Sequence, residues 1–170
     1  MANEEQLQLI KKGVEGWNRW REENPDTVPE LSRADLRGAQ LQKANLSKAC
    51  LQEAKLQFTH LNGANLEGAN LKKAKLQEAN LQSANLRNAN LAGAGLLESN
   101  LQYADLTNAD LQGAQFNEDV LLTQTQLQGA NLSAATGLGS SQIQSALTGN
   151  QTRLPDYLNE ELDDDFLLQM

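Results

Sequence analysis

The chain has little of what usually builds or cross-links a small globular domain. Cys50 is the only cysteine among 170 residues, which excludes an intrachain disulfide. Aromatic residues make up only 4% of the chain, so leucine and alanine have to build the core. His60 is the only histidine, which excludes a dyad or metal site built on several histidines.

Long apolar runs are also absent. No stretch is long enough to cross a bilayer. The start of the chain, "MANEEQLQLIKKG", begins acidic and lacks the apolar segment of a signal peptide. We therefore expect a cytoplasmic protein with no membrane partner.

What the sequence has in abundance is a leucine at every fifth residue. Of the 18 positions from Leu31 to Phe116 in steps of five, 17 are leucine, and 15 of the 17 positions two residues before them, from 34 to 114, are alanine. A step of five turns an α-helix by about 140° net, which scatters the leucines around its axis. On a straight strand the same step alternates faces. Neither regular element buries this pattern on one side.

An Ala–Leu pair two residues apart can point the same way from a short extended edge. If the chain turns a corner every five residues, all pairs point into one tube, whose coils stack at about 4.8 Å. Features such as Lys55 and Lys75 recur after 20 residues, compatible with four edges per coil. The predicted lumen residues after Leu31 are Leu36, Leu41, Leu46, Leu51, Leu56, Leu61, Leu66, Leu71, Leu76, Leu81, Leu86, Leu91, Leu96, Leu101, Leu106, Leu111 and Phe116.

The pattern slips once, because Leu127 and Leu132 come one residue late. A single inserted residue is absorbed by a bulge, which we place near 117–121.

Motifs such as "ANLEG", "ANLKK", "ANLQS", "ADLTN" and "ADLQG" resemble pentapeptide repeats, over about residues 31–136. The resemblance implies an all-β solenoid, a right-handed quadrilateral β-helix of about five coils. The segment "GVEGWNRWREENPDTVPELSRADL" is also similar to the leader that precedes the repeats in stand-alone cyanobacterial members of this family.

The open ends of such a tube need covers. Residues 1–30 are predicted to form an N-terminal cap, helical over 3–23 with a break at Gly13 or Gly16. Its apolar stripe consists of Leu7, Ile10, Val14, Trp17 and Trp20.

Residues 137–170 are predicted to form a C-terminal cap and an acidic tail. The stretch 139–150 is typical of a short helix with Ser140 or Ser141 as N-cap, and "TRLPDYL" is expected to be extended. Six acids fall within 156–165, before the apolar end Phe166, Leu167 and Leu168. That end is a candidate docking segment; the alternatives are folding back towards Lys55 and Lys75, or disorder.

A filled tube offers no cleft for catalysis, so we expect no enzyme, no cofactor and no metal. Residues 31–136 hold nine basic and nine acidic residues, without the dense basic stripe of a nucleic-acid binder. The favoured hypothesis is a structural scaffold that binds a protein partner, as a monomer or weak dimer. The alternative is a DNA mimic like the topoisomerase-protecting members of the family.

Overall fold

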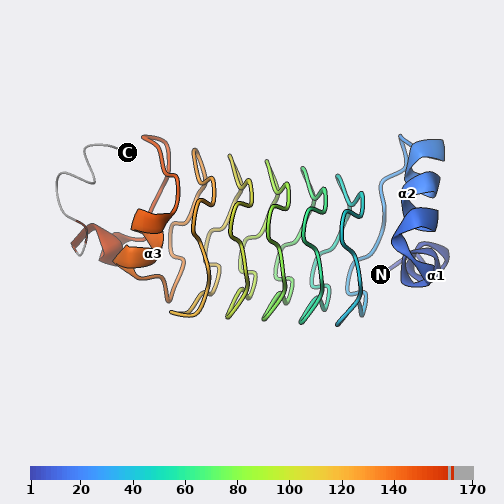
Figure 1. Ribbon diagram of the computed structural model, residues 1–170, viewed down its shortest axis with the longest axis horizontal. Coiled ribbons are helices and arrows are strands. Elements are labelled where there is room, and N and C mark those ends of the chain that lie inside the picture. The colour runs from blue at the N-terminus through green and yellow to red at the C-terminus, as the bar shows by residue number, and fades with distance from the viewer. Residues whose placement is uncertain (161, 163–170) are drawn as a thin grey trace.

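The computed structural model describes residues 1–160 and 162. Figure 1 shows a rod of stacked coils with helices at both ends. Helices α1 (Glu4–Lys12) and α2 (Val14–Glu23) lie at the N-terminal end. Helix α3 (Ser140–Ser145) and the 3₁₀-helix η1 (Asp156–Glu160) belong to the C-terminal end. The docking segment at Phe166, Leu167 and Leu168 lies outside the described residues.

The coils are joined by parallel bridges that pair each edge with the edge 20 residues later. Four columns of bridges make four faces. They are face 1, with Glu30, Cys50, Asn70, Asn90, Asp110, Asn131 and Arg153; face 2, with Asp35, Lys55, Lys75, Gly95, Gln115 and Thr136; face 3, with Gln40, His60, Asn80, Asn100 and Leu121; and face 4, with Asn45, Asn65, Asn85, Asp105, Gln126 and Leu147. We name each corner by the two faces that it joins.

Each corner is a tight turn. At the corner 1/2 of one coil, the amide of Ala74 donates to the carbonyl of Leu71 at 2.9 Å, and Lys73 has φ of 57°. A positive φ at the third residue is the geometry of a type II turn, for which glycine is the usual choice. Glycines do occupy equivalent positions, such as Gly63 and Gly93, but 14 residues other than glycine adopt positive φ as well. The fold imposes this conformation whatever the residue.

The lumen is filled by the two inward columns. The leucines from Leu31 to Leu111 are at most 2% exposed, and Phe116 is 6% exposed. Thr59 and Ser99, which break the alanine column, are fully buried, and their hydroxyls donate to the carbonyls of Leu36 and Leu96. A buried hydroxyl is tolerated there because a backbone carbonyl accepts its hydrogen bond.

The predicted insertion lies where the sequence places it. Bridges before it join residues 20 apart, as in Asn80↔Asn100, whereas Asn100↔Leu121 joins residues 21 apart. The extra residue therefore falls between Gln115 and Leu121, in the corner 2/3, which confirms the predicted bulge. A further residue is added later, since Asn131 pairs with Arg153.

At the N-terminal end, the predicted helix breaks at Gly13, with φ of 143°. Trp17 is fully buried, and its indole Nε1 donates to the carbonyl of Asn45 at 2.8 Å. Asn18 donates to the carbonyl of Lys43 and accepts from the amide of Asn45. Arg21 is 6% exposed and donates to the carbonyls of Thr27 and Ser47. Side chains of helix α2 thus hydrogen-bond to backbone groups at the open edge of the first coil.

The C-terminal end differs from the prediction in three details. Helix α3 is shorter than 139–150, since it stops at Ser145. Its N-cap is Gly139 rather than Ser140 or Ser141, because the Gln142 side chain turns back to accept from the Gly139 amide at 2.8 Å. The stretch "TRLPDYL" is only partly extended: Arg153 joins the last bridge of face 1, and the 3₁₀-helix η1 begins at Asp156.

Candidate interaction surface

Within the described residues, His60, Cys50 and the charged side chains of the coils lie on the outside of the rod. Across residues 1–160 and 162, no three His, Cys, Asp or Glu side chains are grouped so that they could hold a metal ion. Among the helices of that same part, none is long and apolar enough to span a membrane. His60 is exposed on face 3. Cys50, half-buried on face 1, lies 3.0 Å from the hydroxyl of Ser32, which also hydrogen-bonds to Glu30.

The Asn or Asp that precedes most inward leucines has a role that the sequence reasoning missed. At ten positions its Oδ1 accepts from the amide two residues later, at 2.9–3.2 Å. This is an Asx turn, which fixes the entry into the next corner. The recurring Ala-Asn-Leu and Ala-Asp-Leu triplets were the sequence signal for these turns.

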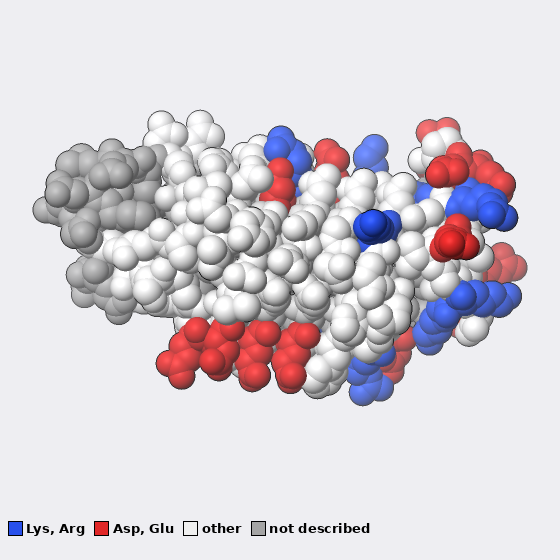
Figure 2. Space-filling model, in the orientation of Figure 1, with Lys and Arg blue, Asp and Glu red and all other residues white. Residues whose placement is uncertain are grey.

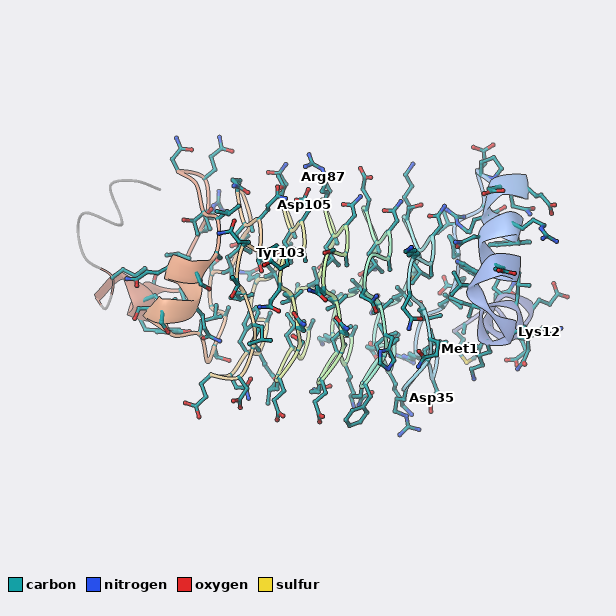
Figure 3. All side chains as sticks on the ribbon, viewed as in Figure 1. Met1, Lys12, Asp35, Arg87, Tyr103 and Asp105 are labelled. Atoms are coloured by element: carbon teal, nitrogen blue, oxygen red, sulfur yellow. The ribbon has the colours of Figure 1, made fainter. Side chains whose placement is uncertain are left out.

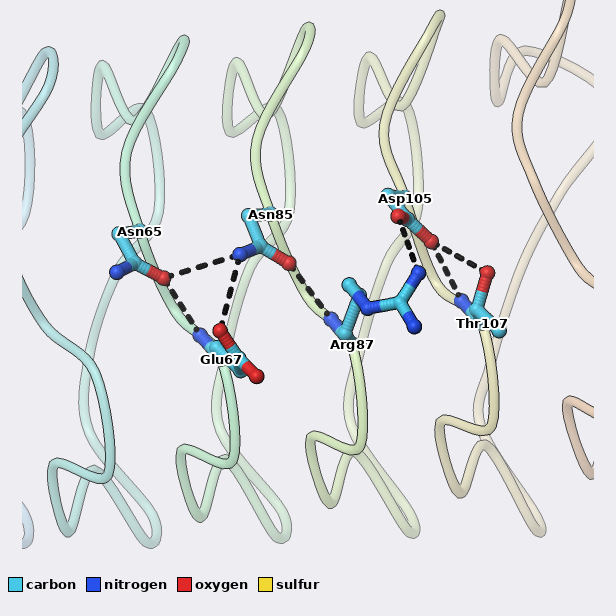
Figure 4. A network of polar contacts seen from close by, with 6 residues as sticks. All are labelled: Asn65, Glu67, Asn85, Arg87, Asp105 and Thr107. Atoms are coloured by element: carbon cyan, nitrogen blue, oxygen red, sulfur yellow. Dashed lines mark hydrogen bonds and ion pairs between the residues drawn. The ribbon is translucent and has the colours of Figure 1, made fainter.

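On face 4 and the corner 4/1 these side chains join into a network across coils (Figure 4). Asn85 donates to Asn65 at 3.3 Å, and Arg87 pairs with Asp105 at 3.1 Å. Partial burial acts to raise the pKa of Asp105, but hydrogen bonds from Thr107 and Arg87 outweigh it, so the pKa is lowered. The network is largely satisfied within the chain, which leaves little of it for a partner.

Two further ion pairs neutralise charges near the start of the rod. Arg33 pairs with Glu53 at 3.0 Å, and Arg37 with Asp35 at 2.6 Å. The hydrogen bond from Arg37 lowers the pKa of Asp35 to about 2, and the hydrogen bond from Arg33 lowers the pKa of Glu53.

The corner 2/3 carries an acidic row made of Glu78, Glu98, Glu118 and Asp119. All four are exposed, and none is in an ion pair within the described part of the chain. Figure 2 shows acidic side chains in a continuous row along the lower edge of the rod, in its C-terminal half. Phe58, which is also exposed, occupies the same corner in the coil before that of Glu78.

From Asn62 onward, the corner 3/4 and the adjoining edge of face 3 form what we call the uncharged strip; in the coil before it, exposed Lys43 occupies the same corner. Its residues are Asn62, Asn80, Gln82, Ser83, Asn100, Gln102, Tyr103, Thr123 and Gln124. Figure 2 shows a broad area above the acidic row that is uncharged except for one basic side chain towards its N-terminal end, and Figure 3 labels Tyr103 in the C-terminal half of the rod in the same view. Tyr103 is 54% exposed, the largest aromatic exposure in the described residues. This strip is the main candidate interaction surface, and periodicity alone gave no sign of it.

The predicted cap residues lie between the helices and the first coil. Ile10 and Trp17 are buried, and Leu7, Val14 and Trp20 are partly buried against the core. The rings of Trp17 and Trp20 are 5.2 Å apart. A hollow of about 530 Å³ next to α1 is lined in part by Leu9, Lys12 and Trp20.

The family model for pentapeptide repeats matches residues 30–57, 49–88 and 79–117, more than half of the chain. The protein therefore belongs to the pentapeptide repeat family, and its rod is a right-handed quadrilateral β-helix.

Solved structures of the same family resemble the chain. A pentapeptide repeat protein of the Arabidopsis thaliana thylakoid lumen matches at 30% identity with a TM-score of 0.61, over 63% of this chain and 73% of that one. HetL, involved in heterocyst differentiation regulation in the cyanobacterium Nostoc sp. strain PCC 7120, matches at 34% identity with a TM-score of 0.47, over 64% of this chain and 56% of that one. A trypsin-treated form of QnrB1, a plasmid-mediated fluoroquinolone resistance protein, matches at 18% identity with a TM-score of 0.42, over 82% and 83% of the two chains, which is too weak to carry a functional argument. No curated protein sequence matches the chain.

Proposed function

We propose that the protein is a non-enzymatic scaffold that binds a protein partner on the uncharged strip. In this proposal residues 31–136 form a rod of about five coils, and 1–30 and 137–170 cap its two ends. The location is cytoplasmic, with neither nucleic acid nor a membrane as partner. The observation that carries the proposal is the exposed Tyr103 in the middle of a neutral, amide-rich surface.

The composition of the strip favours protein recognition. Binding surfaces rich in Tyr, Ser, Gly and Asn combine a large, stiff aromatic contact with adaptable hydrogen bonding. Charged residues are depleted in the centre of protein interfaces, and tyrosine is enriched there. The strip contains no charged residue and surrounds one exposed tyrosine with amide and hydroxyl side chains.

The strip is also held in place before any partner arrives. The amide of Ser83 donates to the carbonyl of Gln102 at 2.9 Å, and the amide of Tyr103 to that of Thr123 at 3.1 Å. A surface whose backbone is fixed in this way loses little conformational entropy on binding.

The surfaces on either side of the uncharged strip constrain the kind of partner that can bind there. A standard interface buries about 800 Å² on each side, more than one narrow strip provides, so the partner must reach past it. The acidic row borders the strip across face 3. The expected partner therefore has an uncharged, hydrogen-bonding centre and a basic edge.

A capture experiment with two matched aromatic variants tests the proposal. Phe58 and Tyr103 are 53% and 54% exposed and share φ of 60°, but only Tyr103 lies in the strip. We expect Tyr103→Gly to abolish capture of a host protein that the wild type and Phe58→Gly both retain. Because glycine suits positive φ, neither variant should lower the melting temperature. Equal capture by all three proteins would remove Tyr103 from the interface.

The alternative of a DNA mimic leads to a separate expectation. Residues 31–88 hold nine basic and four acidic residues, so half of the rod has no anionic track to imitate a phosphate backbone. We expect no protection of DNA gyrase from quinolones at stoichiometric protein in a supercoiling assay. Protection at near-equimolar protein would favour the mimic over the scaffold.

A further inference from the structure

Charge is divided sharply along the rod. Residues 31–88 contain nine basic and four acidic residues, whereas 89–170 contain one basic and eleven acidic residues. The ion pairs of the described residues leave most of this charge unneutralised, because only Arg33, Arg37 and Arg87 have a carboxylate within 4.0 Å.

Four exposed lysines concentrate the positive charge in what we call the lysine patch: Lys55, Lys72, Lys73 and Lys75. Lys55 and Lys75 are bridge partners in adjacent coils of face 2. Lys72 and Lys73 form the adjoining corner 1/2 of the coil that contains Lys75. No described carboxylate is within ion-pair distance of any of them. Stacked like charges repel one another, so the patch favours an anionic segment laid across it.

We propose that the lysine patch binds the acidic tail of a second copy of this chain, in an antiparallel side-by-side pair. The acidic segment is Asp163, Asp164 and Asp165, which follows Leu162 in the sequence. Each copy gives its tail to the patch of the other, so both patches are occupied in one closed dimer.

The tail begins at the far end of the rod from its own patch, so an intrachain contact would require a fully extended tail. Leu162 is buried at the C-terminal end of the rod. The patch begins three rungs before the last rung of face 2, from Thr136 to Lys75. Three rungs span about 14 Å at the usual spacing. The backbone of the three aspartates extends at most about 10 Å beyond Leu162, so contact with its own patch would also require extended Asp and Lys side chains.

In an antiparallel dimer the tail does not have to span this distance, because it meets the lysine patch of the other copy. It places the C-terminal end of one rod beside the basic half of the other, whereas a parallel copy puts both tails at the same end, away from both patches. Antiparallel rods also align the basic half of each with the acidic half of its partner. Since the net charge of −8 opposes association as a whole, the pair depends on these local contacts and is weakened by salt.

A charge-exchange experiment on the full chain tests the pairing. One variant reverses the patch, with Lys55→Glu, Lys72→Glu, Lys73→Glu and Lys75→Glu. The other reverses the tail, with Asp163→Lys, Asp164→Lys and Asp165→Lys. A control carries Lys43→Glu and Lys48→Glu, which change exposed lysines on other corners. Sedimentation velocity over a range of concentrations and salt measures mass.

We expect the wild type to form a salt-sensitive dimer, and the control, which changes the basic half but not the patch, to dimerise more strongly than either reversed variant. Each reversed variant alone should dimerise roughly tenfold or more weakly, because several ion pairs become repulsive together. An equimolar mixture of the two variants should dimerise again, because each negative patch then meets a positive tail.

Two results would overturn the proposal: a wild type that stays monomeric at its highest soluble concentration, or a mixture that stays monomeric. A tail variant that melts lower with unchanged mass would indicate an intrachain strap instead.

The lysine patch lies diagonally across the rod from the uncharged strip, so loss of dimerisation with retained partner capture separates this proposal from the scaffold function.

Discussion

Replacing Leu76 by alanine is expected to destabilise the protein by about 2–5 kcal/mol, the usual cost of a leucine-sized cavity in a rigid core. Leu76 is fully buried in the middle of the lumen, with Leu56 and Leu96 at the equivalent positions of the coils on either side. The walls cannot collapse onto the cavity, because backbone hydrogen bonds fix the spacing of the coils; the amide of Leu76, for example, donates to the carbonyl of Gly95 at 2.8 Å. Urea unfolding, followed by circular dichroism, measures the loss.

The matched control is Leu97→Ala, one residue after the lumen leucine of the next coil. Leu97 is only partly buried at a corner, so its truncation should cost much less, within about 0.5–1 kcal/mol. Similar losses for the two variants would mean that the lumen does not dominate the stability of the rod.

Removing residues 1–23 is expected to turn the monomeric or dimeric protein into end-to-end oligomers with a lower melting temperature. The deletion exposes apolar lumen side chains, including Leu31 and Leu46, and leaves backbone groups at Lys43, Asn45 and Ser47 without the side chains that bind them. An uncovered coil edge of this kind pairs readily with another edge. Static light scattering across protein concentrations measures the association.

A second variant separates the apolar packing of the N-terminal helices from their hydrogen bonds to the first coil. Asn18→Ala removes two hydrogen bonds to the first coil but leaves Ile10 and Trp17 in place. This variant should melt at a lower temperature yet show the oligomeric state of the wild type. If the truncated protein also keeps that state and its heat stability, the helices do not act as a cap.

The sequence by itself determined the course of the chain through the coils. A leucine at every fifth position and an alanine two residues before it can share one interior only if the chain turns after each pair, which gives the stacked coils and their lumen. The late arrival of Leu127 and Leu132 located the extra residue, because a strict period makes a single insertion visible. The prediction of a helix over 3–23 rested on the same kind of evidence, a regular apolar spacing.

Tertiary structure decided what the outward positions do, because the period places no restriction on them. Which outward residues become neighbours depends on the number of edges per coil: only a coil of four edges stacks Lys55 on Lys75 and lines up Glu78 with Glu98. The exposure of Tyr103 and the capture of Asp105 by Arg87 are set by contacts between residues 18 or more positions apart, which no local pattern encodes. The end of α3 is likewise a tertiary effect, since the Gln142 side chain donates to the carbonyls of Asn117 and Val120 in the bulged corner. A repeat fixes its interior by periodicity, whereas its surface is fixed only when the coils are stacked.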